Sequence, residues 1–343
     1  MGALRHIRAS EESESSQPQS QPQPGETLHS PSNARVVSVP AVHHFDNAPD
    51  NAVIIMDDAG LHSLPLKAAL IAGRLTLQRA ASLGTDLGAF LRVLHARGSS
   101  RAAGADAGAD SRALHEALEG NTWGREISAW ATYGRLVGAT LRALDGDEEG
   151  ASASAGASAG DRERVVSVLD ELLGVPEETL RVVEALAERR ATQIKEAQGD
   201  AFLMGDFWPG NVLVGDDEEE GVFVVDWELA KIGLAGLDVG QFCAKLATLR
   251  RLRPEQAEAA GEVLKSFVQA YFKGEVGPEA DETRRVTLGH FGVHLVVWTP
   301  RGGWGGGAGP TRALMLDGVT RLVEGADASR IWTDEELVQK FLS

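Results

Sequence analysis

The sequence predicts an α+β protein that is mainly helical and carries two short pairs of strands. Two β-branched runs, VLV at 212–214 and VFVVD at 222–226, flank the polar turn GDDEEEG and are typical of an antiparallel hairpin. A second strand-like pair, VVSVPAVHHFD and NAVIIMDD, flanks the turn-forming stretch NAPDN. Most of the remaining apolar residues recur at helical spacing. Together these patterns predict small sheets attached to a larger helical body.

Charge and composition narrow the function classes. The chain has 343 residues and a net charge of −17, which argues against nucleic acid or an anionic membrane as the main partner. Its single cysteine, Cys243, excludes an internal disulfide and a cysteine-ligated metal cluster. No apolar run approaches the ~18 residues of a membrane span, and MGALRHIRAS lacks the apolar core of a signal peptide. We therefore expect a soluble, cytoplasmic protein, and its acidic balance is compatible with cationic small substrates.

The elements are predicted in chain order. Residues 9–35 are rich in Ser, Glu, Gln and Pro and lack apolar mass, so residues 1–35 are expected to form a disordered tail. The strand pair occupies the next segment, 36–60, and everything from 61 to 343 is expected to form the main body. Its first helix is LGTDLGAFLRVLHARG, which carries apolar residues on one face: Leu83, Leu87, Phe90, Leu91 and Leu94.

Further helices follow that one. WGREISAWATYGRLVGATLRAL is amphipathic, and two more helices are predicted at 162–173 and 176–197. Residues 99–112 and the low-complexity stretch 146–161 are expected to be surface insertions. Pro254 is expected to open a helix with an i, i+4 apolar stripe, and the glycine-rich residues 301–310 to form a loop before the last helices.

The stretch MGDFWPGN places polar side chains on a rigid loop. Asp206 and Asn211 are separated by Pro209 and Gly210, which forbid regular structure there. In a hairpin the start of the first strand lies beside the end of the second, so Asn211 and Asp226 are expected to be neighbours. Mg²⁺ prefers such oxygen ligands together with phosphate and water, and a further carboxylate could accept a hydroxyl proton. The layout therefore favours phosphoryl transfer over a loop whose polar residues only form turns.

These residues carry a resemblance to a known family. GDFWPGNVLV and VVDWE resemble the catalytic loop and metal-binding segment of the aminoglycoside phosphotransferase and choline kinase group, within the protein-kinase-like superfamily. LGAFLRVLHARG resembles the helix behind the catalytic loop, VIIMDDAG the last small-lobe strand and hinge, and GLDVGQF the helix whose Asp braces that loop. The resemblance covers roughly residues 36–300. It implies a kinase-like large lobe at 61–343, mainly helical with a small catalytic hairpin, and a small-lobe remnant with hinge at 36–60.

The resemblance also implies cofactors and roles. Asp206 is the expected base, Asn211 and Asp226 are the expected Mg²⁺ ligands, and Asp238 is the expected brace. ATP is expected to contact backbone groups of the hinge, formed by Met56, Asp57, Asp58 and Ala59. The implied activity is ATP-dependent phosphorylation of a small-molecule hydroxyl. The acceptor stays open among an antibiotic, choline, a methylthio-sugar and an amino alcohol.

The sequence departs from the family pattern in two places. No lysine precedes Lys67, and the segment before Val36 is too short for a glycine-rich loop with a phosphate-binding lysine and its partner helix. Met204 stands where the family usually has a histidine. We therefore expect an impaired enzyme, and the alternatives are a non-catalytic, pseudokinase-like binding protein or a truncated gene product.

Aromatic residues near the expected cleft have two readings. Trp298, Trp304 and His294 lie in HFGVHLVVWTPRGGW, a region that lines the substrate cleft in similar kinases, where an aromatic ring could stack on a sugar or a cation. For these three residues, ordinary packing in the core is the simpler interpretation. Trp208 and Trp227 flank the catalytic aspartates and are expected to wall the site.

Overall fold

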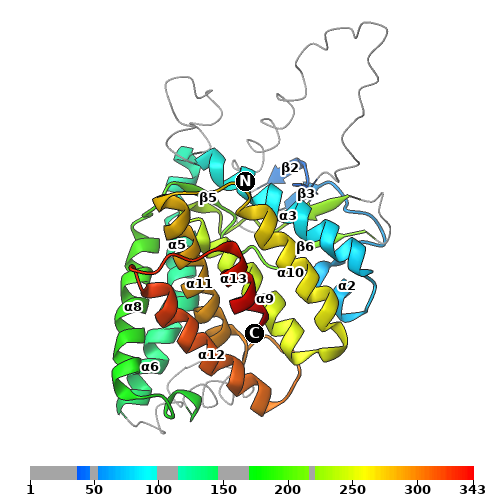
Figure 1. Ribbon diagram of the computed structural model, residues 1–343. Coiled ribbons are helices and arrows are strands. Elements are labelled where there is room, and N and C mark those ends of the chain that lie inside the picture. Colours follow the sequence, from blue (N-terminus) through cyan, green and yellow to red (C-terminus); the bar gives the residue numbers. More distant parts are fainter. Residues whose placement is uncertain (1–36, 47–52, 99–114, 146–169, 216–220) are drawn as a thin grey trace, which may run out of the picture.

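The computed structural model describes residues 37–46, 53–98, 115–145, 170–215 and 221–343 (Figure 1). It has small sheets on a helical body, so the predicted α+β class is confirmed. The predicted tail, the insertions at 99–112 and 146–161, most of the predicted helix at 162–173 and the acidic turn at 216–220 lie outside the described residues. None of the described helices combines the length and apolarity that crossing a membrane requires.

The helical body is built from pairs of packed helices. Helix α3 (Leu77–Gly98) packs against α10 (Ala257–Tyr271), α9 (Gly236–Leu252) against α11 (Pro278–Trp298), and α11 against α12 (Ala308–Ala326) (Figure 1). The apolar stripe predicted on α3 is buried, apart from a partly buried Phe90. The other described helices are α2 (Leu66–Ile71), α5 (Thr122–Ser128), α6 (Arg135–Asp145), α8 (Glu177–Lys195) and α13 (Asp334–Leu342), with a 3₁₀ turn at Pro254–Gln256.

The amphipathic helix predicted from WGREISAWATYGRLVGATLRAL has an irregular centre. Helices α5 and α6 are joined by a π-helical stretch, η1 (Ala129–Gly134). Such π-bulges occur mostly inside α-helices at functional positions. Here the stretch carries Ala131 and Thr132 into a cavity described below.

Two small sheets hold the loops of interest. The predicted hairpin is confirmed as β6 (Val212–Val214) antiparallel to β7 (Val222–Val224), with Val212 opposite Val224. Strand β4 (Leu64–Pro65) extends the same sheet beside β6. A separate pair, β5 (Ala201–Leu203) and β8 (Lys231–Gly233), brackets the hairpin in the sequence. The sequence analysis did not predict this second pair, whose strands are separated by the whole hairpin segment.

The strand predicted across residues 36–46 is divided into two strands in the structure. One strand was expected across VVSVPAVHHFD, but the structure divides it around Pro40, into β1 (Val37–Ser38) and β2 (Val42–Asp46). Proline has no N–H to donate and interrupts a ladder. As a result β1 pairs in parallel with β7 of the hairpin sheet, while β2 pairs with β3 (Val53–Met56) as predicted.

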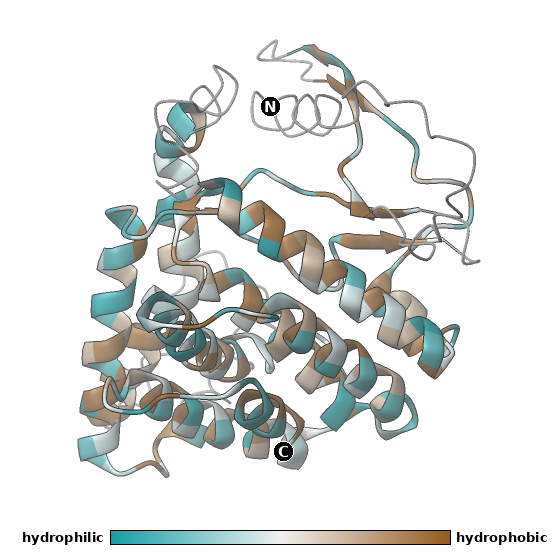
Figure 2. Ribbon diagram, turned by 45° about the horizontal axis from the view of Figure 1, so that its top comes forward, coloured by the Kyte–Doolittle hydropathy of each residue, from teal (hydrophilic) through white to brown (hydrophobic). Residues whose placement is uncertain are grey.

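The β2–β3 pair forms its own two-stranded sheet, which exposes apolar side chains beside polar ones such as His43 and Asp46 (Figure 2). Phe45, Val53, Ile54, Ile55 and Met56 are between 38% and 52% exposed. The division into a small-lobe remnant at 36–60 and a large lobe at 61–343 stays a prediction. Strand β1 lies on the hairpin sheet, whereas β2 and β3 form a separate two-stranded sheet.

Candidate active site

Two loops lie side by side between the two small sheets. The 204–211 loop connects β5 to β6, and the 225–230 loop connects β7 to β8. Because β5 pairs with β8 and β6 with β7, the ends of both loops are held at fixed separation. The Val225 N–H donates to the Asn211 carbonyl at 2.9 Å, which continues the hairpin ladder into the loops. Asn211 is therefore in direct contact with Val225, the residue before Asp226, and a metal ion shared by Asn211 and Asp226 stays a prediction.

Asp206 is held by two side-chain amides. Gln241 Nε2 donates to its Oδ1 at 2.5 Å, and Asn211 Nδ2 donates to its Oδ2 at 3.0 Å. Burial raises the pKa of Asp206 above its ordinary value, and the Gln241 hydrogen bond and the Lys245 charge oppose that shift. The Asp226 carboxylate is close enough to contribute to raising the same pKa. A carboxylate with a raised pKa and a fixed orientation has the properties of a general base.

Asn211 and Asp226 can offer oxygens to a metal ion. Asn211 is 8% exposed, and its amide nitrogen donates to the carbonyl and the carboxylate of Asp206. Its amide oxygen is therefore available to coordinate a metal ion. The Asp226 side chain is exposed and makes no hydrogen bond or ion pair to the described residues. Its φ of 71° is the left-handed conformation, which non-glycine residues adopt rarely and often at functional sites. Both groups fit Mg²⁺, which commonly takes one or two protein oxygens plus water and phosphate.

Asp238 braces the start of the 204–211 loop from α9. Its carboxylate accepts the backbone N–H of Met204 at 2.8 Å and of Gly205 at 3.0 Å, so the predicted brace is confirmed. His95 of α3, which the sequence reading missed, adds a contact from Nε2 to Asp238 at 3.2 Å and from Nδ1 to the Tyr271 hydroxyl at 2.7 Å. A buried histidine therefore supports the loop from another helix, beside Met204.

Gly205 is required by its backbone. Its φ is 87°, and a Cβ there would lie 2.1 Å from the Leu229 carbonyl oxygen. Only glycine adopts this conformation without strain and allows the two loops to approach this closely. The residue before Asp206 therefore fixes the spacing between the 204–211 and 225–230 loops.

The predicted hinge lies at the end of β3. Asp57 donates its N–H to the Ala41 carbonyl at 2.9 Å and accepts the Ala41 N–H on its carboxylate at 2.8 Å. Its other carboxylate oxygen contacts His43 Nε2 at 2.7 Å. The Asp57 N–H is thus used within the β2–β3 pair, and the Ala59 carbonyl accepts the Ser63 hydroxyl. The adenine contact of Met56, Asp57, Asp58 and Ala59 stays a prediction that the remaining backbone groups would have to fulfil.

A cavity of about 250 Å³ opens beside Asp206. Its walls come from α5 and η1, α9, α11 and the 301–304 loop, and neither the hinge residues nor Asn211 and Asp226 line it. Trp208, as expected, lines it, and so do Trp298, Trp304 and His294, although Trp304 also belongs to the hydrophobic core and Trp298 packs against it. Trp227 is a core residue instead: it packs against Phe202 and donates from Nε1 to the Val224 carbonyl.

Three polar residues of this site were not found by sequence reasoning. Gln241 and Lys245 lie on α9 at three and seven positions after Asp238, on one face of a mostly buried helix. That spacing was a readable signal, because buried polar residues sharing a helix face commonly serve one site. Lys231, on β8, donates to the Ser128 hydroxyl at 2.8 Å and the Leu229 carbonyl at 3.0 Å. Burial lowers its pKa to about 8.

Comparisons with known proteins find relatives that are named as kinases. The chain is 26% identical over 275 residues to a 4-hydroxytryptamine kinase of Psilocybe cyanescens, which covers 78% of this chain and 62% of that protein. A 4-hydroxytryptamine kinase of Psilocybe cubensis is 29% identical over 111 residues, 31% of this chain and 29% of that protein. The chain therefore spans less than two thirds of the length of either relative.

Solved structures and a family match complete the comparison. A glucosamine kinase aligns over 80% of this chain and 63% of its own, with 16% identity and a TM-score of 0.35. Residues 25–280, which include both site loops and the α9 brace, match the phosphotransferase enzyme family (APH). Because that match extends over most of the chain, the protein belongs to the phosphotransferase enzyme family.

Proposed function

We propose that this chain is an ATP-dependent phosphotransferase that acts on the hydroxyl group of a small molecule. The observation that carries the proposal is the position of Asp206, held by Gln241 and Asn211 at the wall of a cavity, with Asp226 on the neighbouring loop. Family membership and the kinase names of the relatives support it. Cytoplasmic location and the absence of nucleic-acid and membrane partners stay part of the proposal.

Each residue has a role in the proposed reaction. Asp206 orients the acceptor hydroxyl and accepts its proton as the phosphoryl group is transferred. Asn211 and Asp226 would hold Mg²⁺, which supplies charge neutralisation for the phosphate oxygens. The 56–59 segment would present backbone groups to adenine. Asp238 keeps the 204–211 loop in place without contacting the reacting atoms.

We further propose that phosphoryl transfer by these 343 residues is slow. Lys67 is the first lysine of the sequence, and its ammonium lies 4.0 Å from the centroid of the Trp304 ring at the cavity. The Lys67 side chain is thus at the cavity proposed to bind the acceptor. It is not at the hinge, beside which the phosphates of a nucleotide would lie. Losing one preorganised charge-stabilising donor costs ~10²–10³ in rate. A binding protein without catalysis is the second candidate, and the same observation favours it.

An ATP-consumption assay tests the proposed function. The full chain with Mg²⁺ is given a panel of phenolic, indolic, sugar and amino-alcohol acceptors, and product formation is followed by ³¹P NMR. We expect transfer slower than ~1 s⁻¹, the low end for kinases. The transfer should be lost in Asp206→Asn and kept in Asp200→Asn, an exposed aspartate outside the site.

The outcomes separate the two candidates. Transfer that survives in Asp206→Asn excludes Asp206 as the base and ends the proposed mechanism. Acceptor binding with no transfer under any condition favours the binding protein. Turnover well above ~1 s⁻¹ shows that the proposed impairment is wrong.

A further inference from the structure

The cavity beside Asp206 has a charge opposite to that of the protein. The whole chain carries 50 acidic and 33 basic residues. The cavity is nevertheless lined by four cationic side chains, Lys67, Lys231, Lys245 and Arg301, and by two carboxylates, Asp206 and Asp238. Asp238 is already used by two backbone N–H groups and His95. Asp206 alone remains to meet a positively charged ligand.

Lys245 is the buried cation of this cavity that has no hydrogen bond or ion pair to the described residues. It is 7% exposed, whereas Lys231, which is also buried, donates to Ser128. A buried ammonium normally has hydrogen-bonded partners, because removing its charge from water is costly. Lys245 instead lines the cavity, with its ammonium 5.0 Å from the Trp298 ring centroid. An anion in the cavity would supply the missing partner.

The aromatic faces are already occupied by the protein's own cations. Lys67 lies 4.0 Å from the Trp304 ring centroid and 5.6 Å from that of Trp208, and Lys245 lies against Trp298. Tryptophan faces at such distances attract cations. An amine entering this cavity would therefore find the ring faces taken and would be repelled by two ammonium groups.

We propose that the acceptor is a hydroxyl compound carrying an anionic group, such as a carboxylate, which Lys245 and Lys67 bind while its hydroxyl faces Asp206. This inference rests on the proposed function and specifies its substrate class. Trp298 and Trp304 supply apolar walls for the body of the ligand, which favours a flat or ring-shaped molecule. The 4-hydroxytryptamine of the relatives' names carries an amine, so this chain is proposed to select a different charge.

The protonation of Lys245 gives the binding a defined pH dependence. Burial lowers the Lys245 pKa to about 7, with the nearby Lys67 charge lowering it further and Asp206 opposing the shift. His290 and His294 face the same cavity, and burial holds the pKa of both well below 6.5, so they are neutral there. An anion binds the protonated lysine, so its affinity should be constant below about pH 7 and weaken above it.

Calorimetric titration of the full chain with matched probe pairs tests the inference. The anionic probes are 5-hydroxyindole-3-acetate, 4-hydroxyphenylacetate and glucuronate, and the cationic ones are 5-hydroxytryptamine, tyramine and glucosamine. We expect the anionic probe with the highest affinity of the three to bind about 10- to 100-fold more tightly than its matched amine. This is the difference expected for one charge-assisted hydrogen bond. Lys245→Met should remove that preference and its pH dependence. Lys265→Met, which removes an exposed lysine of α10, should change neither.

The same titration with Mg–ADP separates the acceptor from the nucleotide as the source of the anion. Under the inference Lys245→Met weakens anionic acceptors and leaves Mg–ADP binding unchanged. Weaker Mg–ADP binding with unchanged acceptor binding overturns it, as does equal or tighter binding of the amines. Failure of every anion to bind at about 10 mM, where even a weak millimolar site is largely filled, overturns it too. Selective anion binding without phosphoryl transfer would keep the inferred anion preference and end the proposed phosphotransferase function. Phosphoryl transfer to amines would keep the proposed function and overturn the anion preference.

Discussion

The carboxylate of Asp206 is tuned at the scale of single residues. Burial raises its pKa, and the hydrogen bond from Gln241 favours the ionised form and opposes that rise. The base must be ionised to accept a proton, so activity should increase as the pH rises through the pKa of Asp206. The acidic limb should therefore lie above ~3.9, the ordinary value for aspartate.

Replacing Gln241 tests this tuning. Gln241→Leu removes a donor to the ionised carboxylate, so the pKa of Asp206 should rise further and the acidic limb of kcat/KM should move to higher pH. The measurement is a pH profile of phosphoryl transfer for the parent and the variant. Gln339→Leu, at an exposed position on α13, serves as the control and should leave the limb in place. A limb that stays fixed or moves down in Gln241→Leu contradicts the assigned contact.

At the scale of elements, helix α9 organises the site. Asp238 lies in its first turn, and Gln241 and Lys245 follow on the same face. The helix is held between α10 and α11, so its polar face is presented to the 204–211 loop with little freedom. A single buried helix thus supplies Asp238, which braces the loop, Gln241, which donates to Asp206, and Lys245, one of the cavity's cations.

Asp238→Ala tests the brace. It leaves the Met204 and Gly205 N–H groups without their acceptor, which should lower the free energy of unfolding by about 1–3 kcal/mol. Denaturant unfolding measures the loss, with Asp200→Ala at an exposed position as the control. Asp238→Asn should lose less, because one amide oxygen can still accept one of the two N–H groups. Unfolding of Asp238→Ala at the same denaturant concentration as the parent would show that Asp238 does not stabilise the loop.

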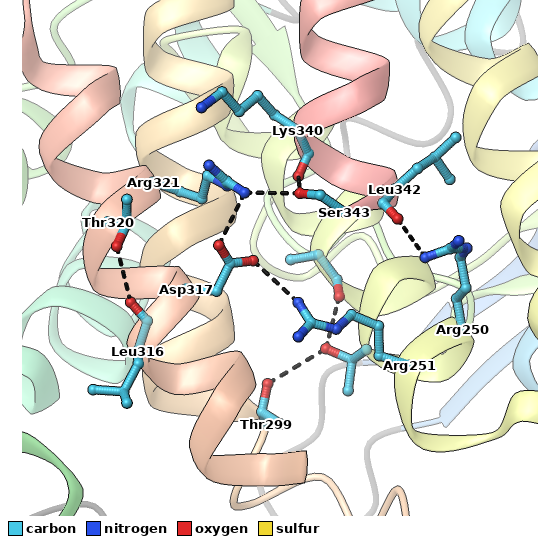
Figure 3. A network of polar contacts seen from close by, with 12 residues as sticks. Arg250, Arg251, Thr299, Leu316, Asp317, Thr320, Arg321, Lys340, Leu342 and Ser343 are labelled. Carbon is cyan, nitrogen blue, oxygen red and sulfur yellow. Dashed lines mark hydrogen bonds and ion pairs between the residues drawn. The ribbon is translucent and has the colours of Figure 1, made fainter.

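On the scale of the whole molecule, polar contacts join the C-terminal helix to the body (Figure 3). Asp317 of α12 bonds Arg251 of α9 at 3.2 Å and Arg321 at 2.9 Å. Arg321 in turn donates to the Ser343 hydroxyl at 2.8 Å, and Arg250 donates to the Leu342 carbonyl at 2.5 Å. These contacts tie α13 to α12 and to α9, and α9 lines the cavity.

Asp317→Ala tests the contribution of this network. It removes the acceptor shared by two arginines, of which Arg321 is 8% exposed, so the expected loss is about 1–2 kcal/mol of unfolding free energy. Thermal and denaturant unfolding provide the measurement. Thr320→Ala is the matched control, because that exposed hydroxyl only bonds Leu316 of its own helix and its loss should change stability by less than ~0.5 kcal/mol. Equal losses in both variants contradict a role for the network.

Local sequence patterns were sufficient for some features of this protein. The hairpin at 212–226 and the apolar stripe of α3 were predictable from such patterns, whereas the brace at Asp238 followed from the family resemblance. Strand periodicity, helix periodicity and turn chemistry act between near neighbours in the chain and leave a readable trace. The family resemblance also rested on such contiguous motifs, and family membership confirmed it.

The tertiary structure alone decided which distant residues share the cavity. Lys67, Lys245 and Trp304 come from α2, α9 and a loop that lie far apart in the sequence. Likewise, β1 joins the hairpin sheet because the free edge of β7 lies beside it, which the break at Pro40 alone does not determine. The pKa of Lys245 is about 7 because burial removes its water, and burial depends on every element that packs around it. Charge selection in the cavity is therefore a property of the packed fold, which no single stretch of the sequence contains.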